Sequence, residues 1–292
     1  MKLTLIDLED TISRPERYND NKNLIFPSFE KEISEEEWDR IVTLTGLSKW
    51  INLKHDVHTY KYIPVSIKEM SLILDIMNST IITGNILPSH IEDLDFLRIR
   101  FEEFEKGKEW FVRMEYCSLK DSIHEGPIKN YIELIKSLLT SHRAKACLTL
   151  QSQYEDQVWL TLMPYNNKID PKREFRCSVY RGNITSISQY VWHKDVGWSQ
   201  KQDELKRIVA NIIEFNRNLD KSKLPESYVL DVYANNKTSE SKDEEIELVE
   251  FNPFGAQMSS GSALFSWVHD QSQMYGGEEE IEVRIAVKIN EN

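Results

Sequence analysis

Cysteine is scarce in this sequence: Cys117, Cys147 and Cys177 are the three cysteines among 292 residues. Their number is odd, their spacing is wide and their contexts are apolar, so neither a disulfide framework nor a zinc-binding spacing follows. This usage is typical of a protein in a reducing compartment, and we expect a cytoplasmic location. The stretch from Met1 to Asp7 is too short and too soon acidic for a secretory signal peptide.

Long apolar runs and an excess of positive charge are also missing. No run approaches the ~18 apolar residues of a membrane-spanning helix, so we expect no membrane segment. The 36 Lys and Arg face 48 Asp and Glu, for a net charge of −12. This balance argues against non-specific binding to nucleic acid, leaves room for a local basic groove, and is compatible with a basic protein partner.

The two common phosphate-binding signatures are absent as well. The chain contains neither Gly-x-x-x-x-Gly-Lys-Ser/Thr nor Gly-x-Gly-x-x-Gly, so neither of those phosphate loops is present. No Ser/His/Asp or Cys/His arrangement indicates a catalytic nucleophile. The sequence therefore identifies no catalytic residue.

What the chain does contain is an acid at the end of an otherwise apolar strand face. Residues 246–252 predict a strand whose side chains alternate between faces, so that Glu250 and Asn252 follow apolar residues on one face. Pro253 then ends the strand. A carboxylate taken out of water costs several kcal/mol unless another group compensates it.

A second acid lies in the strand expected to pair with the first. Residues 228–233 are apolar on both faces apart from Asp231, and a polar loop joins the two strands as an antiparallel hairpin. Pairing Tyr233 near Leu248 places Asp231 almost opposite Glu250. Like charges in that position repel, and without a cation one of them would have to be protonated.

Two kinds of cation can neutralise such a pair. Asp231, Glu250 and Asn252 offer carboxylate and amide oxygens, the hard ligands that suit Mg²⁺ or Mn²⁺ and that commonly hold a substrate phosphate as well. The alternative is an ordinary ion pair with Arg or Lys. The residues by themselves leave both possibilities open.

The distribution of helix and strand patterns predicts an α+β protein of two lobes, residues 1–160 and residues 161–292. Capping boxes at Ser34 and Ser66 begin two helices, and Pro127 is expected to open another. The expected helices cover residues 34–44, 66–76, 91–106, 127–139 and 201–219. The expected strands cover residues 110–116, 157–163, 174–180, 184–191, 228–233, 246–252 and 281–289.

Three arginines lie within or beside these strands. Arg113 stands in an apolar strand and is followed by Ser118 and Lys120, Arg176 opens the strand of residues 174–180, and Arg284 lies on the polar face of the last strand. Near a metal site, arginines can clamp a polyphosphate through bidentate contacts. Residues of this kind are more commonly solvated or engaged in ion pairs, which is the alternative.

Five segments, in order over roughly residues 108–290, carry a family resemblance: Arg173-Glu174-Phe175-Arg176-Cys177, Ile187-Ser188-Gln189-Tyr190, Val229-Leu230-Asp231-Val232-Tyr233, Val249-Glu250-Phe251-Asn252-Pro253-Phe254-Gly255 and Leu264-Phe265-Ser266-Trp267. They resemble the cell-division-cycle-123 family, whose members have an ATP-grasp fold. A weaker likeness extends back to Tyr62–Val65. The resemblance implies a two-lobed ATP-grasp protein with a nucleotide cleft between the lobes.

The resemblance also implies ATP and Mg²⁺, or Mn²⁺, as cofactors. Asp231, Glu250 and Asn252 fall on the metal ligands of the family, with Glu250 where the family usually has Asp. Arg113 falls where the family generally has Lys. The positions that it assigns to ATP binding are Arg113, Ser118, Lys120, Leu162, Met163, Arg176, Gln189 and Arg284.

For function, the resemblance implies a chaperone-like assembly factor that binds the gamma subunit of translation initiation factor 2. The alternative is an ATP-grasp ligase that activates a carboxylate or a nucleic-acid phosphate terminus. Nucleic acid is expected as a partner only under this alternative. Relatives tend to carry a basic residue near Met163 or Pro164, and its absence favours assembly over ligation. The acidic segments 239–247 and 276–282 suit a basic partner surface or are solvated loops.

Overall fold

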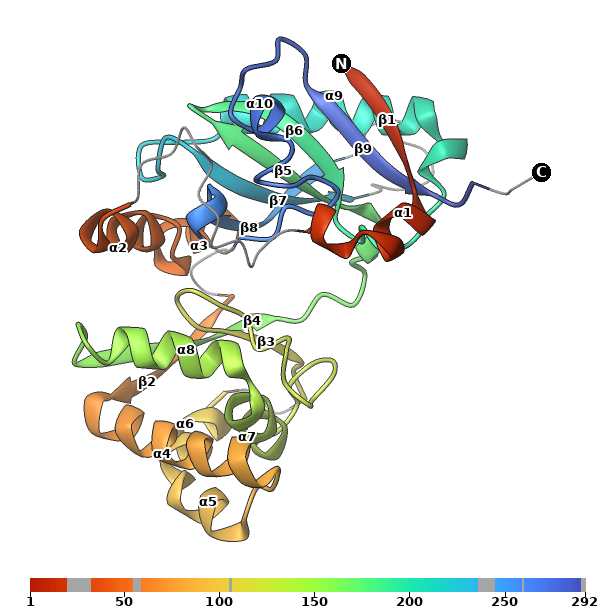
Figure 1. Ribbon diagram of the computed structural model, residues 1–292. Helices are drawn as coiled ribbons and strands as arrows, with labels where there is room; N and C mark the ends of the chain where they lie inside the picture. Colours follow the sequence, from red (N-terminus) through yellow and green to blue (C-terminus); the bar gives the residue numbers. More distant parts are fainter. Residues whose placement is uncertain (20–32, 55–58, 105–106, 236–244, 259, 290–292) are drawn as a thin grey trace. The chain divides into compact units, whose positions relative to one another are not determined.

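The protein, seen here in a computed structural model that describes residues 1–19, 33–54, 59–104, 107–235, 245–258 and 260–289, forms two compact units (Figure 1). The discontinuous unit combines Met1–Lys54 with Lys168–Asn292, and the inserted unit is His55–Asn167. The predicted lobes, residues 1–160 and 161–292, are therefore wrong in their boundaries. Residues 1–54 belong with the C-terminal part because the first strand has its hydrogen-bonding partner there.

The discontinuous unit is built on a six-stranded sheet, as far as the described residues show, in the order β1-β9-β6-β5-β7-β8. Strand β9 pairs in parallel with both β1 and β6, and the other neighbours are antiparallel. The strands are β1 (Lys2–Asp7), β5 (Glu174–Tyr180), β6 (Asn183–Gln189), β7 (Tyr228–Asn235), β8 (Glu245–Pro253) and β9 (Glu282–Val287).

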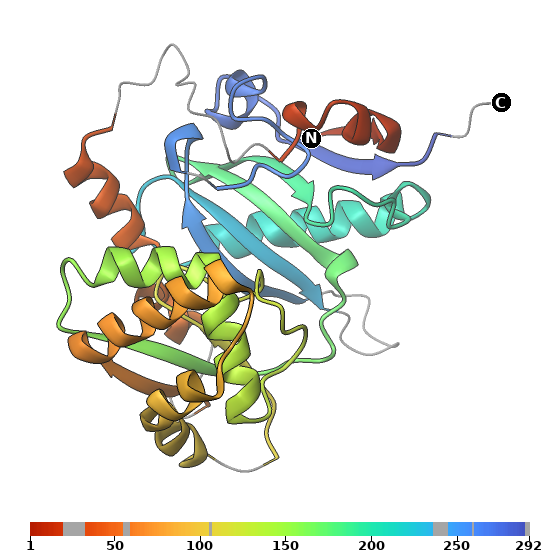
Figure 2. The ribbon, with the colours of Figure 1, turned by 60° about the horizontal axis from the view of Figure 1, so that its bottom comes forward.

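One face of this sheet is apolar and is covered by helix α9 (Gln202–Asn218) (Figure 2). The helix buries a stripe of residues at the spacing of an amphipathic helix, which confirms the helix expected over residues 201–219. Tyr228 of β7 donates a hydrogen bond from its hydroxyl to Asn216 of α9 (2.7 Å), so the helix lies on the face that Tyr228 shares with other apolar residues. The buried stripe of α9 includes Leu205, Ile208, Val209 and Ile212.

The opposite face carries polar side chains, and short elements from both ends of the chain lie over it. An aromatic cluster stabilises this layer: the ring of Phe254 lies 4.9 Å from that of Trp267 and 5.0 Å from that of Tyr275, each edge to face. The remaining elements of this unit are α1 (Leu8–Ser13), η1 (Pro15–Arg17), α2 (Glu35–Leu44), α3 (Leu47–Lys54), η2 (Pro171–Arg173), η3 (Trp198–Gln200), η4 (Ala256–Met258) and α10 (Gln271–Met274).

Within its described residues, the inserted unit packs helices on one face of a three-stranded antiparallel sheet with the order β2-β4-β3. Ser66 and Glu69 form the predicted capping box of its longest helix, which ends at Gly84 in the left-handed conformation (φ 70°). The strands are β2 (Lys61–Ser66), β3 (Trp110–Arg113) and β4 (Gln157–Pro164), and the helices are α4 (Ile67–Thr83), α5 (Pro88–Asp93), α6 (Asp95–Glu102), α7 (Tyr131–Thr140) and α8 (His142–Gln151).

Two helix predictions in this unit need correction. The helix expected over residues 91–106 is two short helices, because the chain leaves the helical path at Leu94. The helix expected to open at Pro127 begins at Tyr131, because Asn130 accepts a hydrogen bond from the Glu133 amide (3.1 Å) and so acts as the N-cap. Among the described residues, no helix is both long and apolar enough to cross a membrane.

Helix α4 offers a matched test of the inserted core, because it carries isoleucines of opposite exposure. Ile73 is fully buried, whereas Ile82 is 84% exposed. We expect Ile73→Ala to lower the free energy of unfolding by about 2–5 kcal/mol, since it leaves a cavity, and Ile82→Ala to change it by less than about 0.5 kcal/mol. Urea unfolding of the two variants measures both values, and equal losses would contradict this packing.

Candidate functional site

Six side chains form one row, called the rank below, across the six-stranded sheet of the discontinuous unit. Residues that pair directly across strands point to the same face, and here each pairs with the next in register. The face is the polar one, opposite α9. From β1 to β8 the rank runs Thr4, Arg284, Ser188, Arg176, Asp231 and Glu250.

Asp231 is held by an arginine within this rank. Its carboxylate accepts two hydrogen bonds from Arg176, at 2.8 Å from Nε to Oδ1 and 2.6 Å from Nη2 to Oδ2. Asn252 donates a third, from Nδ2 to Oδ2 (3.2 Å). Asp231 is only 1% exposed, and the structure thus shows the ion pair that the sequence left open as an alternative.

Arg176 is itself fixed on several sides. Its Nη1 donates to the Gly261 carbonyl (2.7 Å), and its guanidinium lies 5.1 Å from the centre of the Tyr190 ring. Burial disfavours the charged guanidinium, but the Asp231 carboxylate outweighs burial and raises the pKa of Arg176 above its usual value, with smaller contributions from Tyr190 and Glu250. A Cβ at residue 261 would lie 2.5 Å from Oδ1 of Asn19 and 3.1 Å from Nη1 of Arg176, so a larger residue there would require these side chains to shift.

Glu250 pairs directly with Asp231 across the strands, as predicted from the sequence. The rest of the predicted register is shifted: Tyr233 pairs with Glu247 because Val249 is an extra residue, which makes a bulge in β8 beside the acid pair. Glu250 is 5% exposed, so two buried carboxylates share this part of the sheet.

The donor set fits a hard divalent cation. The carboxylate of Asp231 accepts hydrogen bonds from Arg176 and Asn252, and carboxylate oxygens are also ligands of hard cations. Glu250 adds two oxygens and Asn252 a carbonyl oxygen, the ligand types that Mg²⁺ prefers. The described residues contain no group of three or more His, Cys, Asp or Glu suited to a metal. A cation here would therefore depend also on the Asn252 side chain and on oxygens of a bound phosphate.

Farther along the rank, Arg284 belongs to a buried ion network. Asp270 accepts paired hydrogen bonds from Arg284 (2.9 and 3.0 Å) and from Arg17 (2.7 and 2.8 Å). Arg284 also donates to Glu282 (3.0 Å) and lies 4.0 Å above the centre of the Phe265 ring. These contacts engage the Arg284 side chain within the protein, and its predicted contact with ATP stays a prediction.

The side chain of Gln189 is likewise engaged, by hydrogen bonds to backbone groups. Its amide donates to the carbonyls of Val191 and Lys194 (2.7 Å each) and accepts from the Ala286 amide (3.0 Å). Because it pairs with Phe175 in the sheet, the register assigns it to the face opposite Asp231. Its role in nucleotide binding also stays a prediction.

The other predicted ATP-binding residues lie in the inserted unit. Arg113, at the end of β3, is 6% exposed and forms a β-bridge with the buried Ser118, and the exposed Lys120 follows. Leu162 and Met163 are buried in β4, where they pair with the β3 residues Val112 and Phe111. The structure thus brings Arg113 and Ser118 together within one unit, and Arg176, Asp231, Glu250 and Asn252 together within the other.

Comparison with known proteins identifies the family of this chain. A sequence profile of the D123 family matches residues 133–291, more than half of the chain. The chain belongs to the D123 family. A CDC123-like protein of Acanthamoeba polyphaga mimivirus, L884, is 30% identical over 169 residues, which are 55% of this chain and 50% of that protein. The chain thus spans about half the length of the curated relative that it matches.

Solved structures show the same fold for this D123 family member. Cdc123 from Schizosaccharomyces pombe aligns with a TM-score of 0.62 at 17% identity, over 91% of this chain and 100% of the other. Its C-terminally truncated form aligns with a TM-score of 0.61 at 18% identity, over 85% of this chain and 98% of the other. The predicted family and the α+β, ATP-grasp-like fold are confirmed.

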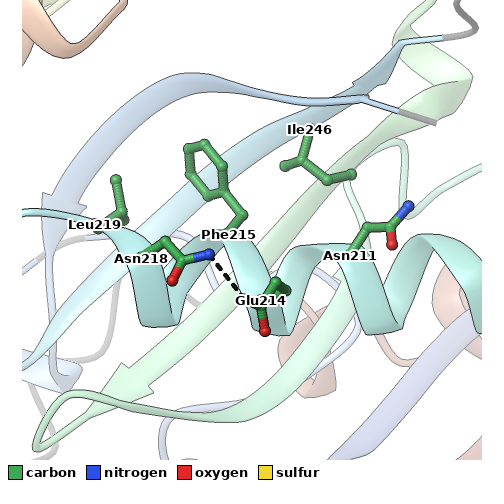
Figure 3. A pocket seen from close by; sticks show the side chains of 6 residues that line it. All are labelled: Asn211, Glu214, Phe215, Asn218, Leu219 and Ile246. Atoms are coloured by element: carbon green, nitrogen blue, oxygen red, sulfur yellow. Dashed lines mark hydrogen bonds between the residues drawn. The ribbon is translucent and has the colours of Figure 1, made fainter. Parts of the chain in front are cut away.

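A surface hollow lies away from the family's predicted metal ligands. The hollow has a volume of about 340 Å³ and lies along α9, where Asn218 donates a hydrogen bond to Glu214 (2.8 Å). Figure 3 shows the side chains that line it. No residue predicted for the site lines it, and it belongs to the α9 side of the sheet, opposite Asp231. Its lining consists of Asn211, Glu214, Phe215, Asn218, Leu219 and Ile246.

The polar face also contains Asp270, Glu282 and Arg17, none of which was predicted from the sequence. Glu282 carried a usable signal, since it stands two residues before Arg284 on the same face of a strand. Asp270 follows the Leu264–Trp267 signature closely, but nothing in its own neighbours indicates a buried acid. Arg17 lies in a stretch without a clear hydrophobic period, so its pairing with Asp270 is visible only in the folded chain.

Asp270 makes the stability of the protein depend on pH. Burial raises its pKa, but the hydrogen bonds from Arg17 and Arg284 outweigh burial and hold that pKa below its usual 3.8. A carboxyl group with a lowered folded pKa stabilises the fold above its unfolded pKa, and this stabilisation is lost as the pH falls through the folded value. The network therefore weakens below about pH 4.

We expect Asp270→Asn to lower the free energy of unfolding at pH 7 by about 3–5 kcal/mol, because the buried Arg284 and the half-buried Arg17 lose their shared partner. The loss should shrink as the pH falls below about 4, where the native carboxyl group also becomes neutral. Urea unfolding from pH 7 to pH 3 measures both. Asp203→Asn, whose side chain is 92% exposed, is the control, and an equal effect of the two substitutions would contradict the network.

Proposed function

We propose that this D123 family member binds ATP with Mg²⁺ and acts as an assembly factor for translation initiation factor 2 through its gamma subunit. The observation that supports the proposal most directly is the convergence of Asp231, Glu250 and Asn252 on one buried part of the sheet, beside Arg176. Such a group of acids, amide and arginine combines the ligands of a hard cation with a donor for phosphate.

Each of these residues has a defined task in the proposal. Asp231, Glu250 and Asn252 would hold the cation, and Arg176 would bind phosphate oxygens. The Mg²⁺ ion, when bound, would neutralise charge on the phosphates of ATP. Burial strengthens these interactions, since few water molecules compete for the two carboxylates.

The assembly role is supported by the family and by charge. Both the mimivirus relative and the S. pombe structures carry the Cdc123 name, and the chain has a net charge of −12. Glu278, Glu279 and Glu280 are exposed, as a surface for a basic partner requires. The other predicted acidic segment, residues 239–247, lies largely outside the described residues.

Substitution of Asp231 tests the nucleotide site. We expect Asp231→Asn to abolish Mg²⁺-dependent ATP binding, measured by calorimetric titration with and without Mg²⁺, because the amide lacks the charge that attracts the cation. Glu250→Gln should weaken binding in the same direction. Asp203→Asn, exposed on α9, is the control. Circular dichroism checks that each variant is folded, and unchanged ATP affinity in folded Asp231→Asn would refute the metal assignment.

The partner is tested with purified gamma subunit of translation initiation factor 2. We expect the immobilised chain to capture this subunit, and ATP with Mg²⁺ to increase the capture, because the nucleotide would stabilise the binding conformation. Asp231→Asn should keep the basal capture and lose the increase. Failure of capture with a folded, ATP-binding protein would refute the partner. Production of ADP or AMP stimulated by a small acceptor or by RNA would instead support a ligase.

A further inference from the structure

Arg176 already does at Asp231 what a metal ion would do. Its guanidinium brings one positive charge to two buried carboxylates. It donates paired hydrogen bonds of 2.8 and 2.6 Å to Asp231, and it is attracted electrostatically by the neighbouring Glu250. Without such a charge, like charges in directly paired strand positions would repel. The chain thus supplies a positive charge of its own at the acid pair.

We infer that Arg176 is the resident counter-ion of the acid pair, and that a divalent cation binds there by displacing its guanidinium from Asp231. This inference rests on the proposed function for the identity of the metal site. The guanidinium and a divalent cation compete for the same carboxylate, because two cations within a few ångströms of each other repel strongly when both are buried.

The contacts of Arg176 allow this exchange. Besides Asp231, the guanidinium contacts the Gly261 carbonyl, to which it donates a hydrogen bond (2.7 Å), and the Tyr190 ring, whose centre lies 5.1 Å away. Once released from the carboxylate, its Nε and Nη2 groups are two donors in the geometry that suits a phosphate. The metal therefore makes the phosphate donor available, and the site takes the two together more readily than either alone.

This coupling has a direction that can be measured. Because coupling between two ligands is reciprocal, polyphosphate should strengthen the binding of Mg²⁺ as much as Mg²⁺ strengthens the binding of polyphosphate. Arg176 has two opposite effects, since it competes with the metal alone and assists the metal and polyphosphate together. Removing it should therefore improve one kind of binding and impair the other.

The test uses Arg176→Gln and titrates the full chain with Mn²⁺ or Mg²⁺ alone, without nucleotide. We expect divalent binding to tighten on the order of tenfold relative to the native protein, because the competing charge is gone. In the absence of metal the melting temperature should fall by roughly 10 °C, since Asp231 loses its ion pair with Arg176, and Mg²⁺ should restore most of that loss. Inorganic tripolyphosphate should no longer strengthen metal binding in the variant.

Arg173→Gln is the matched control. Arg173 is also a buried arginine in the discontinuous unit, but its partners are Glu204 (2.5 Å) and the Ala234 carbonyl (2.7 Å), apart from the acid pair. It should also lower the melting temperature, without rescue by Mg²⁺. Arg176→Lys, which keeps one charge but not the paired hydrogen bonds, should give an intermediate effect and covers the case in which Arg176→Gln does not fold.

The outcomes separate this inference from the proposed function. If Arg176→Gln, or Arg176→Lys in its place, binds divalent ions no more tightly than the native chain, the exchange is refuted even where ATP binds. If the native chain binds no ATP but the variant gains metal affinity, the exchange stands and the proposed function falls. Equal rescue of the Arg173→Gln control by Mg²⁺ would also refute the exchange, because the metal would then be acting elsewhere.

Discussion

Everything on the polar face of the large sheet depends on the mutual neutralisation of buried charges. Arg176 and Arg284 stand in the same rank, separated by Ser188, and each is held by a carboxylate that would be costly to bury alone. A buried ion pair adds little net stability compared with apolar packing, but it has strict geometric demands. The main effect of the rank is therefore to determine which backbone segments can lie over the sheet. Its contribution to the stability of the fold is smaller.

The segment that lies over this face is selected by those demands. Arg176 donates to the Gly261 carbonyl and Arg284 to the Leu264 carbonyl, while the Leu264 amide donates to Ser188. The Leu264–Trp267 signature of the family thus has a structural explanation. Its backbone satisfies the polar rank, and its Phe265 and Trp267 rings supply the apolar contacts that hold the segment down.

The acid pair could be predicted from the sequence because its signal is local. An acid within an apolar strand is conspicuous, and the pairing of Asp231 with Glu250 follows from one hairpin. The neutralising cation could not be predicted, because Arg176 lies on a different strand and reaches Asp231 only once β5 and β7 are paired. The bulge at Val249 was missed because nothing in the residue types of β8 marks an extra residue.

The helices and domain boundaries show the same difference between features with a local sequence signal and features that depend on distant contacts. The capping box at Ser66 and the apolar stripe of α9 are short-range patterns, and both predictions are confirmed. The N-cap at Asn130 was overlooked in favour of Pro127, although both are local signals, so that error was one of weighting. The membership of residues 1–54 in the discontinuous unit depends on contacts between opposite ends of the sequence, which no local pattern contains.

The pairing of β1 with β9 also has a consequence for how the protein is made. Lys2 lies beside Glu282 in the finished sheet, so β1 has to wait during synthesis until its partner β9 has been made. The inserted unit, whose strands and helices all lie within His55–Asn167, has its complete sequence long before then and can fold by itself during synthesis. Nascent chains would therefore carry the inserted unit between two parts of the large sheet that cannot pair until β9 has been made.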